Sequence, residues 1–383
     1  MAKIAFIKYG DAPNEYRKCI GANPNYIQFD AIGSYMNEIL KLTQNYKVMV
    51  ISFGNRYASI TDNGHIFTVI PAHNEIIKYI FIPFIYLKLF CFRPSLIVSF
   101  GTPVDALFMS GYSFLFSTPF VPFFAGEFYE SYGKKIYRKI TDFLILKILK
   151  CKHIKIVCAR SEFVKKQLLK KGIQKDKIIV YNLEYTENYF AEYDVNNEVC
   201  GYEFKVIFIG RLTHRKGIYT YLEVAKELTS RIKDIKFYII GDGPECPNIR
   251  ALIEKNHLED KVIMLGPKPS YMIHSYLKSI DVLCIPSFSE SFCKVAFEGI
   301  LSGVPIVCSK IGALEELVID GEIGYLVDPN NIQGFCDKIK LLYENRNLYC
   351  RFKENIIKRK RKIPTYLTPS LIISNLIRNK YSF

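Results

Sequence analysis

The sequence lacks the features that mark metal-binding, secreted and membrane-spanning chains. Its 11 cysteines include no C-x-x-C pair, so we expect them to be reduced and mostly buried, without a structural metal. The opening residues lack the apolar core of a secretory signal, which predicts a cytoplasmic protein. No run reaches the ~18–20 apolar residues of a membrane span. The nearest run, residues 79–92, is broken by Pro83 and Lys88 and predicts a buried or interfacial helix.

The formal net charge of +15 is distributed unevenly along the chain. Residues 1–185 carry +12, residues 186–345 carry −6 and residues 346–383 carry +9. This distribution favours an anionic partner for the basic first half, although lysines can also simply keep a surface soluble. A hydrophobic fraction of 49% excludes a disordered chain.

The length of 383 residues exceeds what one hydrophobic core normally organises, so we expect two domains. Short apolar runs that end in glycine or serine and lead into helical patterns recur along the chain, which is typical of parallel α/β sheets. The pattern fills residues 1–185, stops in the acidic stretch 186–202, and resumes over residues 203–363. We interpret residues 186–202 as an interdomain linker.

The stretch "FIGRLTHRKG", residues 208–217, predicts a phosphate site. It leaves an apolar run at Gly210 and brings Arg211, His214, Arg215 and Lys216 to the start of a helical pattern. Backbone N–H groups and cations at a helix start both suit a phosphate, although a basic loop can also neutralise surface acids. "IIGDGPE", residues 239–245, lacks the full dinucleotide fingerprint and predicts a tight structural turn.

The segment "SESFCKVAFEGILSGVP", residues 289–305, places Glu290 and Glu298 eight positions apart. On one helix that spacing separates them by ~12 Å, whereas the carboxylate pairs of glycoside hydrolases lie ~5–9.5 Å apart. The spacing therefore favours two acceptors that grip distant parts of one elongated ligand over a hydrolytic pair. The alternative for Glu298 is an ordinary solvent-facing helical residue.

Five stretches in this order resemble the carboxyl-terminal domain of the family 4 glycosyltransferases, the large retaining group with the GT-B fold. They are "FIGRLTHRKG", "YIIGDGPE", "VIMLGP", "DVLCIPSFSESFCKVAFEGILSGVPIVCS" and "IGALEELVIDGEIGYLV". The resemblance implies an α/β protein with two Rossmann-like domains and a deep interdomain cleft. It also implies that residues 364–383 pack back on the first domain. The pattern departs from the family at Ala313 and Glu315, where a glycine and a proline are usual.

The resemblance assigns roles in binding a nucleotide-diphosphate sugar. Arg211 and Lys216 would hold the diphosphate, Glu290 would accept from the sugar hydroxyls, and Glu298 would bind the ribose. Gly33 would approach the donor phosphates from the first domain. The implied donor-binding set is Gly33, Arg211, Lys216, Glu290, Ser291, Phe292, Cys293, Lys294, Val295 and Glu298.

The implied catalytic residues are Glu127, Glu290, Arg211 and Lys216. Glu127 lies where many members have a histidine, so it could orient the acceptor hydroxyl or take its proton, or be a buried structural acid. No D-x-D triplet of the kind used by metal-dependent glycosyltransferases of the other major fold occurs. We therefore expect neither a metal nor a cofactor.

The function implied is transfer of a sugar to a saccharide or lipid-linked acceptor in cell-surface glycan synthesis. Residues 131–155 place cations beside apolar residues at helical intervals, which predicts docking on the anionic inner face of the cell membrane, unless they form an ordinary amphipathic helix on the sheet. A nucleotide-sugar epimerase of the same fold is an alternative. A basic nucleic-acid-binding protein is another, against which no helix-turn-helix, RNP or zinc pattern occurs.

Overall fold

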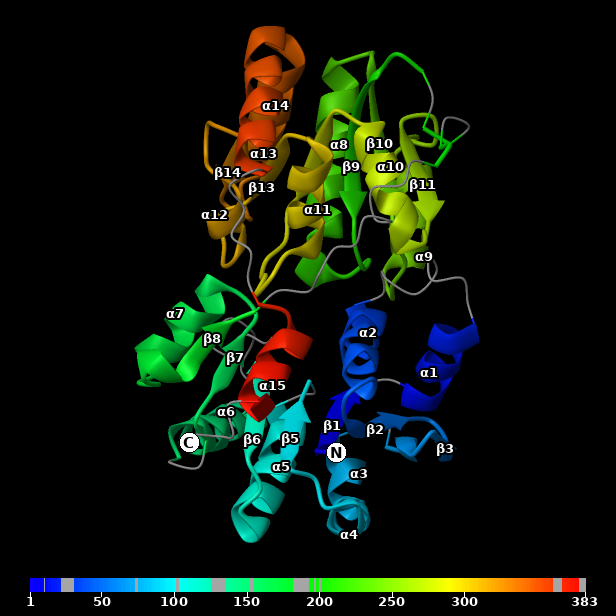
Figure 1. Ribbon diagram of the computed structural model, residues 1–383. Coiled ribbons are helices and arrows are strands. Elements are labelled where there is room, and N and C mark those ends of the chain that lie inside the picture. The colour runs from blue at the N-terminus through cyan, green and yellow to red at the C-terminus, as the bar shows by residue number, and fades with distance from the viewer. Residues whose placement is uncertain are drawn as a thin grey trace. The chain divides into compact units, whose positions relative to one another are not determined.

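The computed structural model divides the chain into two compact units (Figure 1). Unit 1 comprises residues 1–185 and 365–383, and unit 2 comprises residues 186–364. The structure describes residues 1–9, 11–21, 31–72, 75–100, 103–124, 136–151, 154–181, 193–195, 198–199, 201–360 and 367–378. Each unit is described by itself below.

Unit 1 contains an eight-stranded sheet in the order β3-β4-β2-β1-β5-β6-β7-β8. Its strands are β1 (Lys3–Tyr9), β2 (Lys47–Gly54), β3 (Ala58–Asp62), β4 (His65–Pro71), β5 (Leu96–Ser99), β6 (Phe120–Phe124), β7 (Val157–Ala159) and β8 (Ile178–Val180). All neighbours pair in parallel except β3 and β4, which form an antiparallel hairpin. The hairpin turns at Asn63-Gly64, where both residues have positive φ, as a two-residue turn of this kind requires.

Helices cover both faces of this sheet. They are α1 (Ala12–Gly21), α2 (Ala31–Thr43), α3 (Glu75–Ile80), α4 (Ile82–Phe92), α5 (Pro103–Phe116), α6 (Ile136–Lys150), α7 (Glu162–Lys170) and α15 (Pro369–Arg378). Apolar side chains of α4, α5, α6 and α7 form one core cluster with the sheet. Side chains of α1, α2 and α15 form a second cluster that contains the alternate strand residues. Because both faces are covered, the central strands are continuous apolar runs.

Helix α15 belongs to unit 1, although its Ser370 lies 332 positions after Glu38 of α2 in the sequence. Its Ile372 and Ile373 are buried in the same cluster as Met36 and Ile39 of α2. The buried carboxylate of Glu38 accepts hydrogen bonds from the backbone N–H of Ser370 at 2.9 Å and from its hydroxyl at 2.6 Å. These bonds satisfy the start of α15 and fix its position on α2.

Unit 2 contains a six-stranded, fully parallel sheet in the order β11-β10-β9-β12-β13-β14. Its strands are β9 (Phe204–Ile209), β10 (Ile235–Ile240), β11 (Val262–Gly266), β12 (Val282–Ile285), β13 (Ile306–Ser309) and β14 (Gly324–Val327). Its helices are α8 (Ile218–Arg231), α9 (Cys246–Lys255), α10 (Ile273–Lys278), α11 (Lys294–Ser302), α12 (Leu314–Leu317), α13 (Ile332–Glu344) and α14 (Arg346–Lys360). Helices α8, α9 and α13 share one core cluster with the sheet, and α10, α11 and α12 share the other.

The segment interpreted as a linker contributes to unit 2 where it is described. Val195 and Val199 are buried in the core cluster that contains α10 and α11. The backbone N–H of Tyr193 donates to the Ser275 hydroxyl at 2.8 Å. Residues 186–192, 196–197 and 200 lie outside the described residues.

We predict that Glu38→Ala loosens α15 without unfolding the sheet of unit 1. The substitution removes a charged acceptor from a buried backbone N–H, which costs about 1–3 kcal/mol. Amide hydrogen exchange in residues 369–378 should therefore accelerate while exchange in β1 and β2 is unchanged. Glu223→Ala, which removes an exposed carboxylate from α8, is the control. Unchanged protection of α15 in Glu38→Ala would contradict the assignment.

Candidate functional site

The strand order of unit 2 reverses between β9 and β12, and the candidate site lies there. From β9 the chain proceeds outward through β10 and β11, whereas from β12 it proceeds in the other direction through β13 and β14. In open parallel sheets the loops at the carboxyl ends of two such strands diverge and leave room for a ligand. The two loops are residues 210–217 after β9 and residues 286–293 after β12.

Close backbone contacts lock these two loops together. Gly217 has a φ of +73°, and a Cβ at this position would lie 1.8 Å from the carbonyl oxygen of Pro286. The backbone N–H of Phe288 donates to the carbonyl of Arg215 at 2.8 Å. The Arg215 guanidinium in turn donates to the Ser289 carbonyl at 3.2 Å. Only glycine fits position 217, and it brings Lys216 to the loop after β12.

A buried carboxylate occupies the centre of this junction. Glu290 is 3% exposed, and its Oε1 lies 2.6 Å from the Lys216 Nζ. The Ser287 hydroxyl donates to the same oxygen at 2.8 Å. Its backbone carbonyl accepts from the N–H of Ala313, in the loop after β13, at 3.0 Å. A carboxylate held by a cation, a hydroxyl and two loops has a fixed position, as a ligand acceptor requires.

Glu298 lies on α11 and is also buried, at 4% exposed. Its Oε1 is 3.3 Å from the Lys294 Nζ, one helical turn earlier. The interpretation of Glu298 as a solvent-facing residue is therefore wrong. Its neighbours Phe297 and Gly299 are buried as well, since α11 is enclosed on more than one side and exposes little surface at this turn.

Helix α11 begins directly after the Glu290 loop and has no side-chain cap. The positive end of its dipole and the N–H groups of its first turn are the features that bind anions at helix starts. Cys293 occupies the N-cap position and lies within electrostatic reach of Glu290, Lys216 and Glu298. Burial, reinforced by the Glu290 carboxylate, raises the pKa of the Cys293 thiol well above its usual value. The thiol therefore stays protonated at neutral pH and is no nucleophile.

The Gly-Asp-Gly turn after β10, residues 241–243, packs against the loop 210–217. A Cβ on Gly243 would lie 2.4 Å from the Leu212 carbonyl oxygen, so the two loops touch. The Leu212 N–H donates to the Asp242 carbonyl at 3.0 Å. This is the structural turn that the sequence predicts.

An aromatic contact also ties the basic loop to this turn. The His214 ring stacks on Tyr219 with centroids 4.4 Å apart, and the Tyr219 hydroxyl donates to the Glu245 carboxylate. That hydrogen bond raises the pKa of Tyr219 and lowers the pKa of Glu245. The phenol therefore stays protonated and the carboxylate ionised at neutral pH, which keeps the bond intact.

The remaining predicted residues are placed less centrally. Arg211 is exposed directly after Gly210, and Ser291, Phe292 and Val295 are half-buried around the start of α11. Gly33 lies within α2 of unit 1. Glu127 lies outside the described residues.

Sequence reasoning missed Ser287, and it assigned Arg215 to a phosphate site without foreseeing the contact that this residue makes. Ser287 holds the Glu290 carboxylate, and Arg215 binds the backbone of the opposite loop. A signal existed for Ser287, because it follows the apolar run of β12 just as Gly210 follows that of β9. The role of Arg215 depends on the contact between two loops and leaves no local signal.

Residues 192–359 match the family model for glycosyl transferases group 1. This match covers less than half of the chain, and it agrees with the resemblance seen in the sequence. An uncharacterized glycosyltransferase of Methanocaldococcus jannaschii is 31% identical over 201 residues. That alignment covers 52% of this chain and 53% of the relative, so the chain spans about half the length of this curated relative.

Solved structures resemble the chain over its whole length. Sucrose-phosphate synthase from Thermosynechococcus elongatus superposes with a TM-score of 0.79 and 17% identity, covering 100% of both chains. HepE of Anabaena, solved with UDP and glucose, superposes with a TM-score of 0.74 and 16% identity, again covering 100% of both chains. At such identities the likeness concerns the fold alone, and it confirms the expected GT-B class with two α/β units.

We predict that Gly217→Ala lowers the free energy of unfolding by more than ~3 kcal/mol, because the new Cβ must displace the Pro286 carbonyl. Gly303→Ala is the matched control. Gly303 has a φ of +79° and no heavy atom within 4 Å of the added Cβ, so it should cost only about 1–2 kcal/mol. The chain has no tryptophan, so urea unfolding is followed by circular dichroism. Equal losses in the two variants would contradict the tight contact.

Proposed function

We propose that the chain transfers a sugar from a nucleotide-diphosphate sugar to a saccharide or lipid-linked acceptor. The observation that carries this proposal is the pair of buried carboxylates, Glu290 and Glu298, each beside a lysine at the reversal of strand order. The match of residues 192–359 to the group 1 family model supports it. Burying a carboxylate is costly even when a lysine is paired with it, and binding a ligand rich in hydroxyl groups would give these two a function.

The donor would lie along the start of α11. We assign the diphosphate to Lys216, Arg211 and the first-turn N–H groups of α11, because all three supply positive charge. Arg211 is exposed and forms no ion pair within the described part of the chain, so its guanidinium is available to donate hydrogen bonds to a phosphate. Glu290 would accept hydrogen bonds from the sugar hydroxyls and Glu298 from the ribose hydroxyls, which accounts for their positions eight residues apart.

In the reaction, the bond between the sugar anomeric carbon and the diphosphate oxygen breaks as the acceptor oxygen bonds to that carbon. Negative charge grows on the departing diphosphate, where Lys216, Arg211 and the α11 dipole would stabilise it. The acceptor hydroxyl loses its proton, and we assign its orientation or deprotonation to Glu127. The family resemblance favours retention of the anomeric configuration.

These cationic groups would replace a metal in stabilising the leaving group, so we propose a reaction without metal or cofactor. Within the described residues no group of three or more His, Cys, Asp or Glu side chains could hold a metal ion. We further propose a cytoplasmic enzyme on the inner face of the cell membrane that acts in cell-surface glycan synthesis. The net positive charge of residues 1–185 supports an anionic membrane as partner.

We predict that one class among UDP-, GDP- and ADP-sugars raises the thermal midpoint of the protein, since a ligand that binds only the folded state stabilises it. Glu298→Gln keeps the shape of the side chain but loses its charge. It should weaken donor affinity about tenfold to hundredfold. Glu223→Gln, on the exposed face of α8, is the control and should bind as the wild type does.

The absence of a shift with every nucleotide sugar would contradict the proposal. Product analysis then separates transfer from epimerisation. An epimerase converts the donor without an acceptor, whereas a transferase releases nucleoside diphosphate in proportion to the glycoside formed.

We also predict that the donor-induced shift and the transfer rate persist after excess EDTA and gel filtration. Lys216→Ala should lower the transfer rate about 100- to 1,000-fold, because it removes a cation from the developing charge. Loss of activity on chelation, with recovery on adding a divalent cation, would overturn the metal-free assignment.

A further inference from the structure

Helices α4, α5 and α6 of unit 1 expose large apolar side chains at one edge of the sheet. We define this apolar edge by six residues: Leu87 and Phe90 on α4, Phe114, Leu115 and Phe116 at the end of α5, and Phe143 on α6. Leu87 is 61% exposed and Phe114 is 72% exposed. Exposed apolar side chains gathered in this way mark an interaction surface, whereas isolated ones do not.

The connections of the fold bring these helices to the same edge. Each helix leads into a parallel strand, so its second half lies where β5, β6 or β7 begins (Figure 1). The rings of Phe90 and Phe116 lie 5.7 Å apart and join α4 to α5. Helix α6 packs against α5. The edge is therefore one surface, and it lies at the amino ends of the strands, away from their carboxyl ends.

These exposed side chains are additional to the packing of the core. The opposite face of α4 buries Ile85, Leu89 and Phe92 in the core cluster of unit 1. The helix thus has apolar residues on two faces, and folding requires only one of them. This explains why residues 79–92 resemble both a buried and an interfacial helix.

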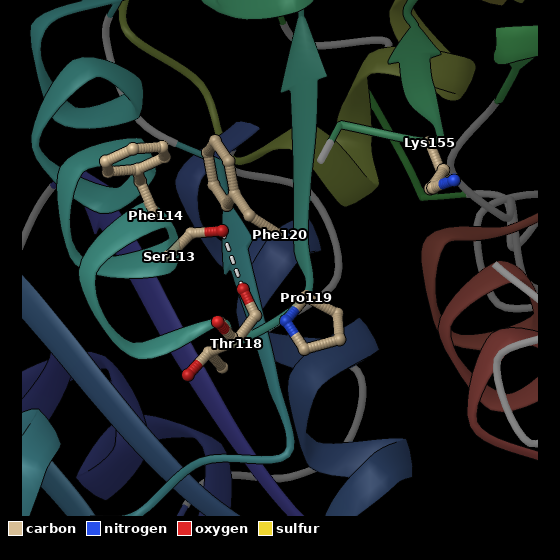
Figure 2. A pocket seen from close by; sticks show the side chains of 7 residues that line it. Ser113, Phe114, Thr118, Pro119, Phe120 and Lys155 are labelled. Carbon is tan, nitrogen blue, oxygen red and sulfur yellow. Dashed lines mark hydrogen bonds between the residues drawn. The ribbon is translucent and has the colours of Figure 1, made fainter. Parts of the chain in front are cut away.

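A pocket of about 320 Å³ opens at this edge between the end of α5 and the start of β6. Figure 2 shows Phe114 and Phe120 on one side of it and Lys155 on the other. The Ser113 hydroxyl donates to the Thr118 carbonyl at 2.6 Å and closes the turn beneath it. The pocket thus combines apolar walls with a cation.

The helices that carry the apolar edge contain more basic than acidic residues, and their only acids are Asp105 and Asp142. Residues 76–104, 106–126 and 143–161 contain no Asp or Glu. The ammonium group of Lys88 lies over the Phe84 ring at 5.0 Å, and that of Lys147 lies over the Phe143 ring at 4.8 Å. Ammonium groups paired with aromatic rings on a surface are suited to a boundary between apolar and anionic layers.

We propose that the apolar edge docks on a lipid bilayer with anionic headgroups. The phenylalanine and leucine side chains enter the boundary between headgroups and acyl chains, and Lys88, Lys147 and Lys155 contact lipid phosphates. No helix among the described residues is long and apolar enough to cross a membrane, so the contact is peripheral. The proposal extends the membrane partner of the proposed function to a specific surface, and its evidence lies in unit 1 alone.

The edge extends beyond the segment that the sequence indicated. Residues 131–155 include α6, but α4 and the end of α5 supply five of the six apolar residues. Docking through this edge directs the carboxyl ends of the unit 1 strands away from the lipid. Those ends, where parallel sheets bind ligands, therefore stay accessible.

The test is co-sedimentation of the full chain with vesicles of phosphatidylcholine and phosphatidylglycerol in equal parts. The wild type should bind these vesicles, bind phosphatidylcholine vesicles more weakly, and lose affinity as salt increases. The double variant Leu87→Ser/Phe114→Ser should bind at least about tenfold more weakly. Lys88→Gln and Lys147→Gln should each weaken binding about fivefold and reduce its salt dependence.

The matched control is Tyr202→Ser/Ile357→Ser, which removes two exposed apolar side chains from unit 2 and should bind as the wild type does. Circular dichroism and the thermal midpoint show that each variant is folded. Failure of the wild type to bind anionic vesicles, or unchanged binding by Leu87→Ser/Phe114→Ser, overturns the proposal. A wild-type dimer in light scattering that this variant abolishes also overturns it, in favour of a second copy of the chain.

The donor-induced thermal shift separates this proposal from the proposed function. Leu87→Ser/Phe114→Ser should retain the full shift while losing vesicle binding. A wild type that shifts with donor but never binds vesicles refutes only the membrane surface. A wild type that binds vesicles but shifts with no donor supports the surface and contradicts the transfer activity.

Discussion

The contact between Gly217 and the Pro286 carbonyl is the constraint on which the candidate site depends. The loops that follow β9 and β12 run in opposite directions and leave a gap at the carboxyl ends of these strands. The contact between Gly217 and Pro286 sets the distance between the two loops. It places Lys216 beside Glu290, so that a buried carboxylate has its counter-charge. Without that counter-charge the carboxylate would be expensive to bury. The glycine is thus a condition for the electrostatics of the site as well as for the turn.

Two kinds of chemistry occupy opposite ends of parallel strands in the two units. In unit 2 the carboxyl ends carry the buried carboxylates and the start of α11. In unit 1 the amino ends carry the apolar edge and its lysines. The separation follows from the α/β architecture, because helices end where strands begin and loops at the other end are free to bind ligands. A chain of this fold can therefore contact a surface without using the loops that bind substrate.

The sequence predicts much of the fold, because buried parallel strands are short apolar runs followed by glycine or serine. The β3–β4 hairpin is not among the expected elements. The dipeptide Asn63-Gly64, a typical hairpin signal, could have indicated it. The positions of Val195 and Val199 are also missed, since two valines in an acidic stretch show no periodicity. Local pattern identifies elements whose burial is continuous, and fails where single side chains anchor an irregular segment.

The same limit governs the site. Spacing argues against a hydrolytic pair for Glu290 and Glu298. It cannot decide whether Glu298 is buried, because an isolated acidic residue in a helix is usually exposed. Its burial results from the enclosure of α11 on more than one side and from Lys294 one turn earlier, which together make a buried charge tolerable. Helix α4 shows the converse, since its pattern is apolar on two faces and only tertiary packing reveals which face is free. Each helix has residues whose exposure is unusual for their type: the charged Glu298 of α11 is buried, and the apolar Leu87 and Phe90 of α4 are exposed. That exposure is decided by the packing of the whole unit and not by the local sequence.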